Sequence, residues 1–199
     1  GSGAWTLGIL QWTWLELVDH VVTPFPTVGD VGYLTTPVAF AAGLFFYGSD
    51  AGGVSATRKQ LGEIGAVLAT MGTMYGFIFG EAIEHQGTSF MYRATALAYP
   101  VLHSTALCFA LTVLWSRSWH RQSLRVVAYI FAGLLSLTIV NTYYAQTILL
   151  ATYEAGHLMD PGWALCFAFT VMAGASELSR DRTTSHDERI RATMGDIII

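Results

Sequence analysis

Two short patterns of acidic residues and histidine carry the clearest chemical signal in this sequence. They are Glu16-x-x-Asp19-His20 and Glu81-x-x-Glu84-His85. Each pattern closes an apolar stretch, and residues i, i+3 and i+4 of a helix share one face. Carboxylate and imidazole groups on facing helices are the ligands of di-metal bundles, and they suit zinc, iron or manganese. Solvated helix ends, where acidic residues and histidines are common, are the leading explanation of these patterns. A site for a small ligand or a divalent metal is the alternative that makes them candidate site residues.

Other polar residues extend this candidate set. Asp30, His157 and Asp160 are expected in loops at the same end as the two patterns. His103 and Asn141 differ, because each lies well inside an apolar stretch. Polar side chains at that depth bridge helices through hydrogen bonds worth about 0.6–2 kcal/mol. We expect a structural bridge at these two positions, and a haem-ligand role for His103 is the alternative.

The composition indicates what kind of protein must position these residues. Charged residues make up 12% of the chain and hydrophobic residues 53%, whereas roughly 25% of an average soluble domain is charged. A soluble protein needs more charge to cover its surface, so the lipid bilayer is the expected partner. The formal net charge of −4 disfavours nucleic acid, which binds basic surfaces. Walker A, G-x-S-x-G, H-E-x-x-H and C-x-x-C motifs are absent from the sequence, which therefore carries no recognised catalytic motif.

Long gaps between charges predict the membrane-crossing elements. A helix needs about 20 mostly apolar residues to cross a bilayer. Six stretches meet that need, at about 4–22, 30–48, 62–84, 93–115, 124–153 and 161–178. The fifth is long, which indicates one helix that tilts or projects beyond the bilayer. The sequence thus predicts an all-α polytopic bundle over 1–178 and a polar cytoplasmic tail or linker over 179–199.

The basic residues predict the orientation of the bundle. Two lie at 58–59, three within 117–125 and four within 180–191, so nine of the ten fall on one side, and only Arg93 lies on the other. Basic loops face the cytoplasm, which puts both ends inside and the 23–29, 85–92 and 154–160 loops outside. We expect a multi-pass protein of a bacterial inner membrane, cut at Ile197-Ile198-Ile199 where a further span or module begins.

Local signals support the boundaries and the packing. Asp160-Pro161 predicts an N-cap followed by proline at the first helical position, and Asp30 predicts the N-cap of the second span. Pro100 predicts a kink in the fourth span. Gly72-x-x-x-Gly76-x-x-x-Gly80 is a small-residue stripe of the kind that lets helices pack closely. A homodimer is a candidate assembly.

Three stretches of the sequence resemble a known family. They are 24–44 (PFPTVGDVGYLTTPVAFAAGL), 94–103 (ATALAYPVLH) and 159–168 (MDPGWALCFA). They are similar to the multi-span membrane region N-terminal to bacterial GGDEF/EAL cyclic-di-GMP enzymes, a type of region that also precedes some sensor kinases. The resemblance runs from about Trp5 to Ala175. In the family pattern, an acidic residue stands at the position of His103 and an aspartate at the position of Asn141.

The resemblance implies a sensor region that regulates a cytoplasmic diguanylate cyclase, phosphodiesterase or kinase domain. A signal at the outer face would change helix packing, and the sixth span would pass the change to the polar tail. The candidate input residues are those of the two acid–acid–histidine patterns. A metal- or haem-containing redox protein and a small-solute transporter are the alternatives. The redox alternative predicts stoichiometric metal or a Soret band in the purified protein.

Overall fold

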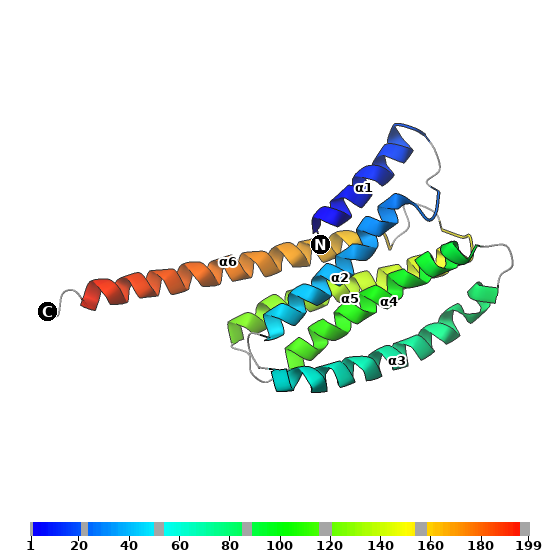
Figure 1. Ribbon diagram of the computed structural model, residues 1–199. Helices are drawn as coiled ribbons and strands as arrows, with labels where there is room; N and C mark the ends of the chain where they lie inside the picture. The colour runs from blue at the N-terminus through cyan, green and yellow to red at the C-terminus, as the bar shows by residue number, and fades with distance from the viewer. Residues whose placement is uncertain are drawn as a thin grey trace.

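The chain folds into a bundle of helices (Figure 1). This computed structural model describes residues 2–20, 24–49, 54–84, 89–115, 121–153 and 159–195, without the side chains at 2, 47–49, 54–60, 63–64, 81–82, 84, 115, 121–123 and 180–195. The helices are α1 (Ser2–Leu17), α2 (Val28–Ser49), α3 (Val54–Glu84), α4 (Phe90–Trp115), α5 (Arg121–Leu149) and α6 (Pro161–Gly195). The described residues contain no strand, so the predicted all-α class is confirmed for them.

Helices α4 and α5 form the centre of the bundle. They pack against each other, α6 packs on α5, and both α2 and α3 pack on α4. Helix α1 packs on α2, so α1 and α3 lie on opposite sides of the bundle (Figure 1). Ala96, Ala106 and Ala110 of α4 are fully buried. Such small side chains let neighbouring helices approach closely.

Two apolar clusters hold the bundle together. The first joins α2, α4 and α5 and consists of Leu44, Ala106, Leu107, Ala110, Val113, Val127 and Leu134. The second joins α3, α4 and α5 and consists of Phe79, Ala96, Ala145 and Leu149. Along α4 and α5, His103 and Asn141 fall between the two clusters, and both are buried. The bundle therefore has a polar layer between two apolar layers.

Among the described residues, three helices are long and apolar enough to cross a membrane. Their apolar parts are Val28–Phe46, Phe90–Leu114 and Leu124–Leu149. Helix α1 has 16 residues, which is short of the roughly 20 that a span needs. The apolar part of α3, Gly65–Gly80, is similarly short, and in α6 the apolar stretch ends at Glu177. The sequence predicted six spans, and half of them have the length and composition of one.

Several helix ends differ from the predicted boundaries. Helix α1 ends at Leu17 and not at 22, and α3 begins at Val54 and not at 62. Helix α5 ends at Leu149, not at 153, because Ala151 takes a positive φ of 54°. The amides of Ala151 and Thr152 then donate to the carbonyls of Ile148 and Thr147 at 3.0 and 2.8 Å. This is the Schellman arrangement that closes a helix. Helix α6 instead continues through the predicted polar tail to Gly195, whereas Ile197–Ile199 lie outside the described residues.

Arg93, the one basic residue on the predicted outer side, lies at the start of α4. Its Nη1 donates to the carbonyl oxygen of Ile83 at 3.1 Å. Ile83 is in the last turn of α3, where carbonyl groups lack helical partners. A local helix-capping role therefore accounts for a positive charge at this end of the bundle.

Glycines mark a close crossing of α1 and α2. A Cβ atom added at Gly32 would lie 2.3 Å from the carbonyl oxygen of Ala4, and one at Gly8 would lie 2.8 Å from that of Gly29. A Cβ atom at Gly72, Gly76 or Gly80 of α3 would meet nothing within 4 Å. The predicted stripe on α3 therefore does not form the close contact, which lies between α1 and α2 instead.

We expect Gly32→Ala to destabilise the bundle by about 1–3 kcal/mol, because the added methyl group meets backbone and forces α1 away from α2. The matched control is Gly43→Ala in the same helix, where an added Cβ meets nothing within 4 Å. Thermal unfolding of the purified chain in nanodiscs, followed by circular dichroism, measures both. Equal unfolding temperatures for the two variants would contradict the close crossing.

Candidate functional site

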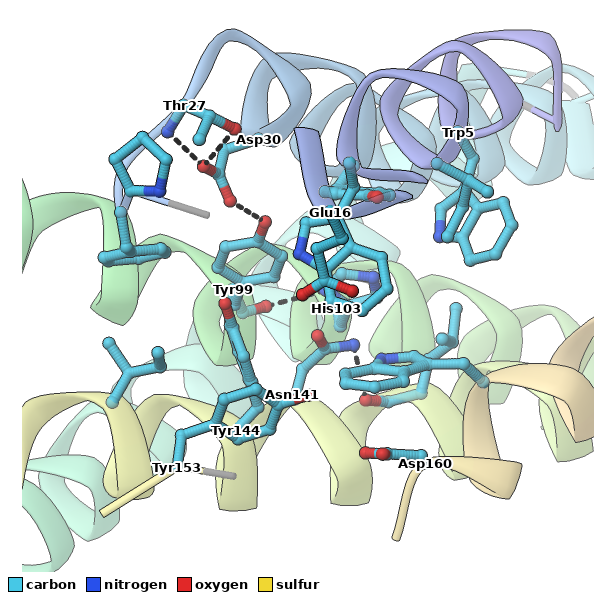
Figure 2. Close-up of a pocket in the computed structure, with 18 residues that line it drawn as sticks. Trp5, Glu16, Thr27, Asp30, Tyr99, His103, Asn141, Tyr144, Tyr153 and Asp160 are labelled. Atoms are coloured by element: carbon cyan, nitrogen blue, oxygen red, sulfur yellow. Dashed lines mark hydrogen bonds between the residues drawn. The ribbon is translucent and has the colours of Figure 1, made fainter. Parts of the chain in front are cut away.

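A cavity of about 380 Å³ lies at the end of the bundle that carries the α1–α2 and α5–α6 connections (Figures 1 and 2). Its lining residues come from α1, α2, α4, α5, the first turn of α6 and the described parts of the α1–α2 and α5–α6 connections. The volume falls in the range of about 300–1,000 Å³ that is typical of small-molecule sites. The cavity reaches from Asp160 at the loop end to His103, which lies about 20 Å along α4 from its first residue.

Asp30 is held at the start of α2 by Thr27 and Tyr99 (Figure 2). Its Oδ2 accepts hydrogen bonds from the backbone amide and the hydroxyl of Thr27, at 2.5 and 3.1 Å, and its Oδ1 accepts one from the Tyr99 hydroxyl. Thr27 Oγ1 accepts in turn from the amide of Gly29 at 3.1 Å. The predicted N-cap role of Asp30 is therefore wrong. Thr27 is the N-cap, and Asp30 is the third helical residue of a capping box.

His103 and Asn141 form the inner wall of the cavity, from α4 and α5. His103 Nδ1 lies 2.8 Å from the carbonyl oxygen of Tyr99, and Asn141 Nδ2 donates to that of Leu137 at 2.8 Å. A carbonyl oxygen only accepts, so His103 Nδ1 carries the proton and Nε2 of the neutral ring is an acceptor. Neither side chain bridges two helices within the described residues, which corrects the predicted structural role.

Aromatic side chains form most of the remaining wall. Tyr144 packs edge-on against four of them, with ring centroids 4.9 Å from Tyr153, 5.5 Å from Tyr99, 5.8 Å from Trp163 and 6.2 Å from Phe25. These contacts join α4, α5 and α6 around one ring. On the α1 side, the Trp5 ring lies 4.2 Å from that of Phe167 in α6. The walls from different helices are thus coupled through ring contacts.

Glu16 and Asp160 bring negative charge to the same cavity. Glu16 is the one acidic residue of α1, which is described throughout its backbone, and Asp160 directly precedes α6. Tyr153 lies beyond the end of α5, outside the apolar span. Burial raises the pKa of Tyr153 to about 12, with further contributions from the charges of Asp160 and Glu16. Both carboxylates therefore act on one tyrosine, which stays protonated at neutral pH.

The two acid–acid–histidine patterns do not meet. Helix α1 ends at Leu17, so Asp19 and His20 lie beyond it and are exposed, which makes the predicted shared helical face wrong for the first pattern. Glu81 and Glu84 lie in the last turn of α3, on the far side of the bundle, and their side chains are not described (Figure 1). His85 and His157 lie outside the described residues.

A metal site finds no support in the described side chains. Among them, no group of three or more His, Cys, Asp or Glu residues lies close enough to hold a metal ion. Of the predicted residues, the cavity brings together Glu16, Asp30, His103, Asn141 and Asp160. A set spread around a cavity of this size fits an organic molecule better than a single ion.

Sequence reasoning missed the aromatic half of the site. The spacing of residues could have indicated these aromatic side chains, because each acidic, histidine or asparagine residue of the lining has an aromatic residue three or four positions away in the sequence. The pairs are Trp12/Glu16, Asp30/Tyr33, Tyr99/His103, Asn141/Tyr144 and Asp160/Trp163. Each interval puts both members on one helical face, except that Asp160 directly precedes α6. Comparisons with protein-family models, with curated proteins and with solved structures find no match for this chain.

Proposed function

We propose that this chain is the signal-input region of a membrane signalling protein. In this proposal it crosses the bilayer six times with both ends in the cytoplasm. A small molecule enters the cavity at the outer end, and α6 carries the resulting change to a cytoplasmic output domain such as a diguanylate cyclase, phosphodiesterase or kinase. The three apolar helices support a chain embedded in a membrane, and the one-sided placement of the basic residues supports this topology.

The observation that carries the proposal is the course of α6. Its first turn contributes Trp163 to the cavity, and the helix then runs without a break to Gly195. Thirty-five residues make a rod about 52 Å long, and the hydrocarbon core of a bilayer is only about 30 Å thick. Figure 1 shows α6 extending far beyond the other helices. A rod with one end in a binding cavity and the other free of the bundle can transmit a small displacement.

Filling the cavity by mutation tests this proposal without a ligand. Ile9 lines the cavity from α1, whereas its neighbour Leu10 is 59% exposed on the outer surface. We expect Ile9→Trp to shift α6 relative to α4 by about 1–2 Å or more, the scale of helix shifts in known switches. Leu10→Trp, with the same added volume outside the cavity, should not.

The shift can be measured by double electron–electron resonance between spin labels at Leu111→Cys in α4 and Leu178→Cys in α6. Both positions are exposed, and the native Cys108 and Cys166 are both buried, so they are first replaced with alanine. A distance distribution that changes with Ile9→Trp alone supports coupling between cavity and α6. Distributions that are unchanged in both variants, or changed equally, would remove the proposal.

A further inference from the structure

The described lining of the cavity is strongly biased towards negative charge. It contains three carboxylates and no lysine or arginine. The carboxylates come from three separate parts of the chain, namely Glu16 in α1, Asp30 in α2 and Asp160 before α6. Surrounding protein lowers the effective dielectric, so such charges attract a cation more strongly than they would in water. The electrostatics of the cavity therefore favour a cationic ligand and disfavour an anionic one.

Among the described residues that line the cavity, the two most deeply buried polar ones select for a ligand that donates hydrogen bonds. His103 and Asn141 are 3% and 2% exposed. Their Nδ1 and Nδ2 groups are used by backbone carbonyls. Within the described residues, His103 Nε2 and Asn141 Oδ1 have no hydrogen-bond partner. Both remaining atoms are acceptors, so a ligand that reaches them is held best through N–H or O–H groups.

The aromatic walls complete this chemistry. Three tryptophans, four tyrosines and one phenylalanine line the cavity. Aromatic faces attract cations, and they also pack against apolar carbon. A divalent metal ion would gain little from such walls, and the described residues gather no metal-binding cluster. The walls suit a cation that carries a hydrocarbon skeleton.

We infer that the cavity binds a small protonated organic amine. The carboxylates attract the ammonium group, the acceptors on His103 and Asn141 can take its N–H donors, and the aromatic rings enclose the carbon skeleton. This inference rests on the proposed function in so far as it names the ligand class of the same cavity. A quaternary ammonium ion fits less well, because it has no N–H group to offer.

Four probes share a phenyl ring on a short carbon chain and differ in the charge and the hydrogen-bond donors of the end group. They are phenethylamine, N,N,N-trimethylphenethylammonium, phenethyl alcohol and phenylacetate. Calorimetry on the purified chain in nanodiscs of neutral lipid measures their affinities. We expect saturable binding of phenethylamine, about tenfold weaker binding of the quaternary ion and the alcohol, and none of phenylacetate. Absence of phenethylamine binding at millimolar concentration, or equal binding of phenylacetate, overturns the inference.

A pair of charge-removing variants locates the binding site. Glu16→Gln should weaken phenethylamine binding about tenfold. Asp19→Asn removes the same charge three residues later, at an exposed position outside the cavity, and should leave the affinity unchanged. Equal effects of the two variants would mean that the amine binds through general surface charge, which overturns the cavity as its site.

The two proposals fail in different ways. If phenethylamine binds but does not change the distance between labels at 111 and 178, the ligand class stands and the sensor function fails. If Ile9→Trp changes that distance but no amine binds, the sensor function stands and the ligand class is wrong. The calorimetry and the spin-label measurement therefore test the two proposals separately.

Discussion

Replacement of Asp30 by alanine is expected to destabilise the chain by about 2–4 kcal/mol. The change removes the acceptor that completes the capping box with Thr27, and loss of a helix cap costs about 1 kcal/mol. It also leaves the hydroxyl of Tyr99 without its acceptor, and Tyr99 is 4% exposed. A buried hydroxyl without a partner costs about 1–3 kcal/mol. Chemical unfolding in mixed micelles, followed by circular dichroism, measures the difference.

Two further variants show whether that loss comes from these contacts. Tyr99→Phe removes only one donor to Asp30 and should cost less, about 0.5–1.5 kcal/mol. Asp19→Ala removes an exposed carboxylate at the same end of the bundle and should change stability little. If Asp30→Ala were as stable as Asp19→Ala, the hydrogen bonds around Asp30 would contribute nothing measurable.

The helices could be predicted from the sequence because their apolar interiors are bounded by charges. The gaps between charged residues put each helix close to its observed place. The predictions fail at helix ends that depend on backbone hydrogen bonds, as at the end of α5 and the start of α2. Helix α5 stops at Leu149 through the positive φ of Ala151, a conformation that residue type alone does not indicate in alanine. Helix α2 begins after Thr27 through a capping box whose second member, Asp30, is the residue that the sequence predicts as the cap.

The candidate site could be predicted only in part, because spacing in the sequence gives local information about single helices. Glu16 and Glu81 are the first residues of two patterns with identical spacing, and yet they lie in helices on opposite sides of the bundle (Figure 1). Spacing shows which side chains share a helical face, and it does not show which helices are neighbours. His103 and Asn141 were found because a polar residue in an apolar helix stands out. Tyr99 and Tyr144 were missed because an aromatic residue there does not.

Gly162→Ala is expected to change both the cavity and the position of α6. A Cβ atom at Gly162 would lie 2.1 Å from Cγ2 of Val140, a β-branched side chain that is 4% exposed and has little rotational freedom. The first turn of α6 must therefore move away from α5, although Ser136 Oγ donates to the carbonyl of Gly162 at 2.8 Å. Overpacking of this kind costs about 1–3 kcal/mol. Because Asp160 and Trp163 flank this glycine and line the cavity, phenethylamine affinity should fall about tenfold or more.

Two further variants distinguish the contact between the added methyl group and Val140 from a general effect of adding a methyl group to α6. Gly174→Ala lies in the same helix, where an added Cβ meets nothing within 4 Å, and it should change neither amine affinity nor the distance between labels at 111 and 178. The double variant Gly162→Ala with Val140→Ala removes the atom that the new methyl group meets, so it should recover most of the lost affinity. If the double variant binds no better than Gly162→Ala alone, contact between α5 and the first turn of α6 does not control the cavity. Recovery in the double variant, with Gly174→Ala unchanged, would mean that the α5–α6 contact at Gly162 sets the shape of the binding site.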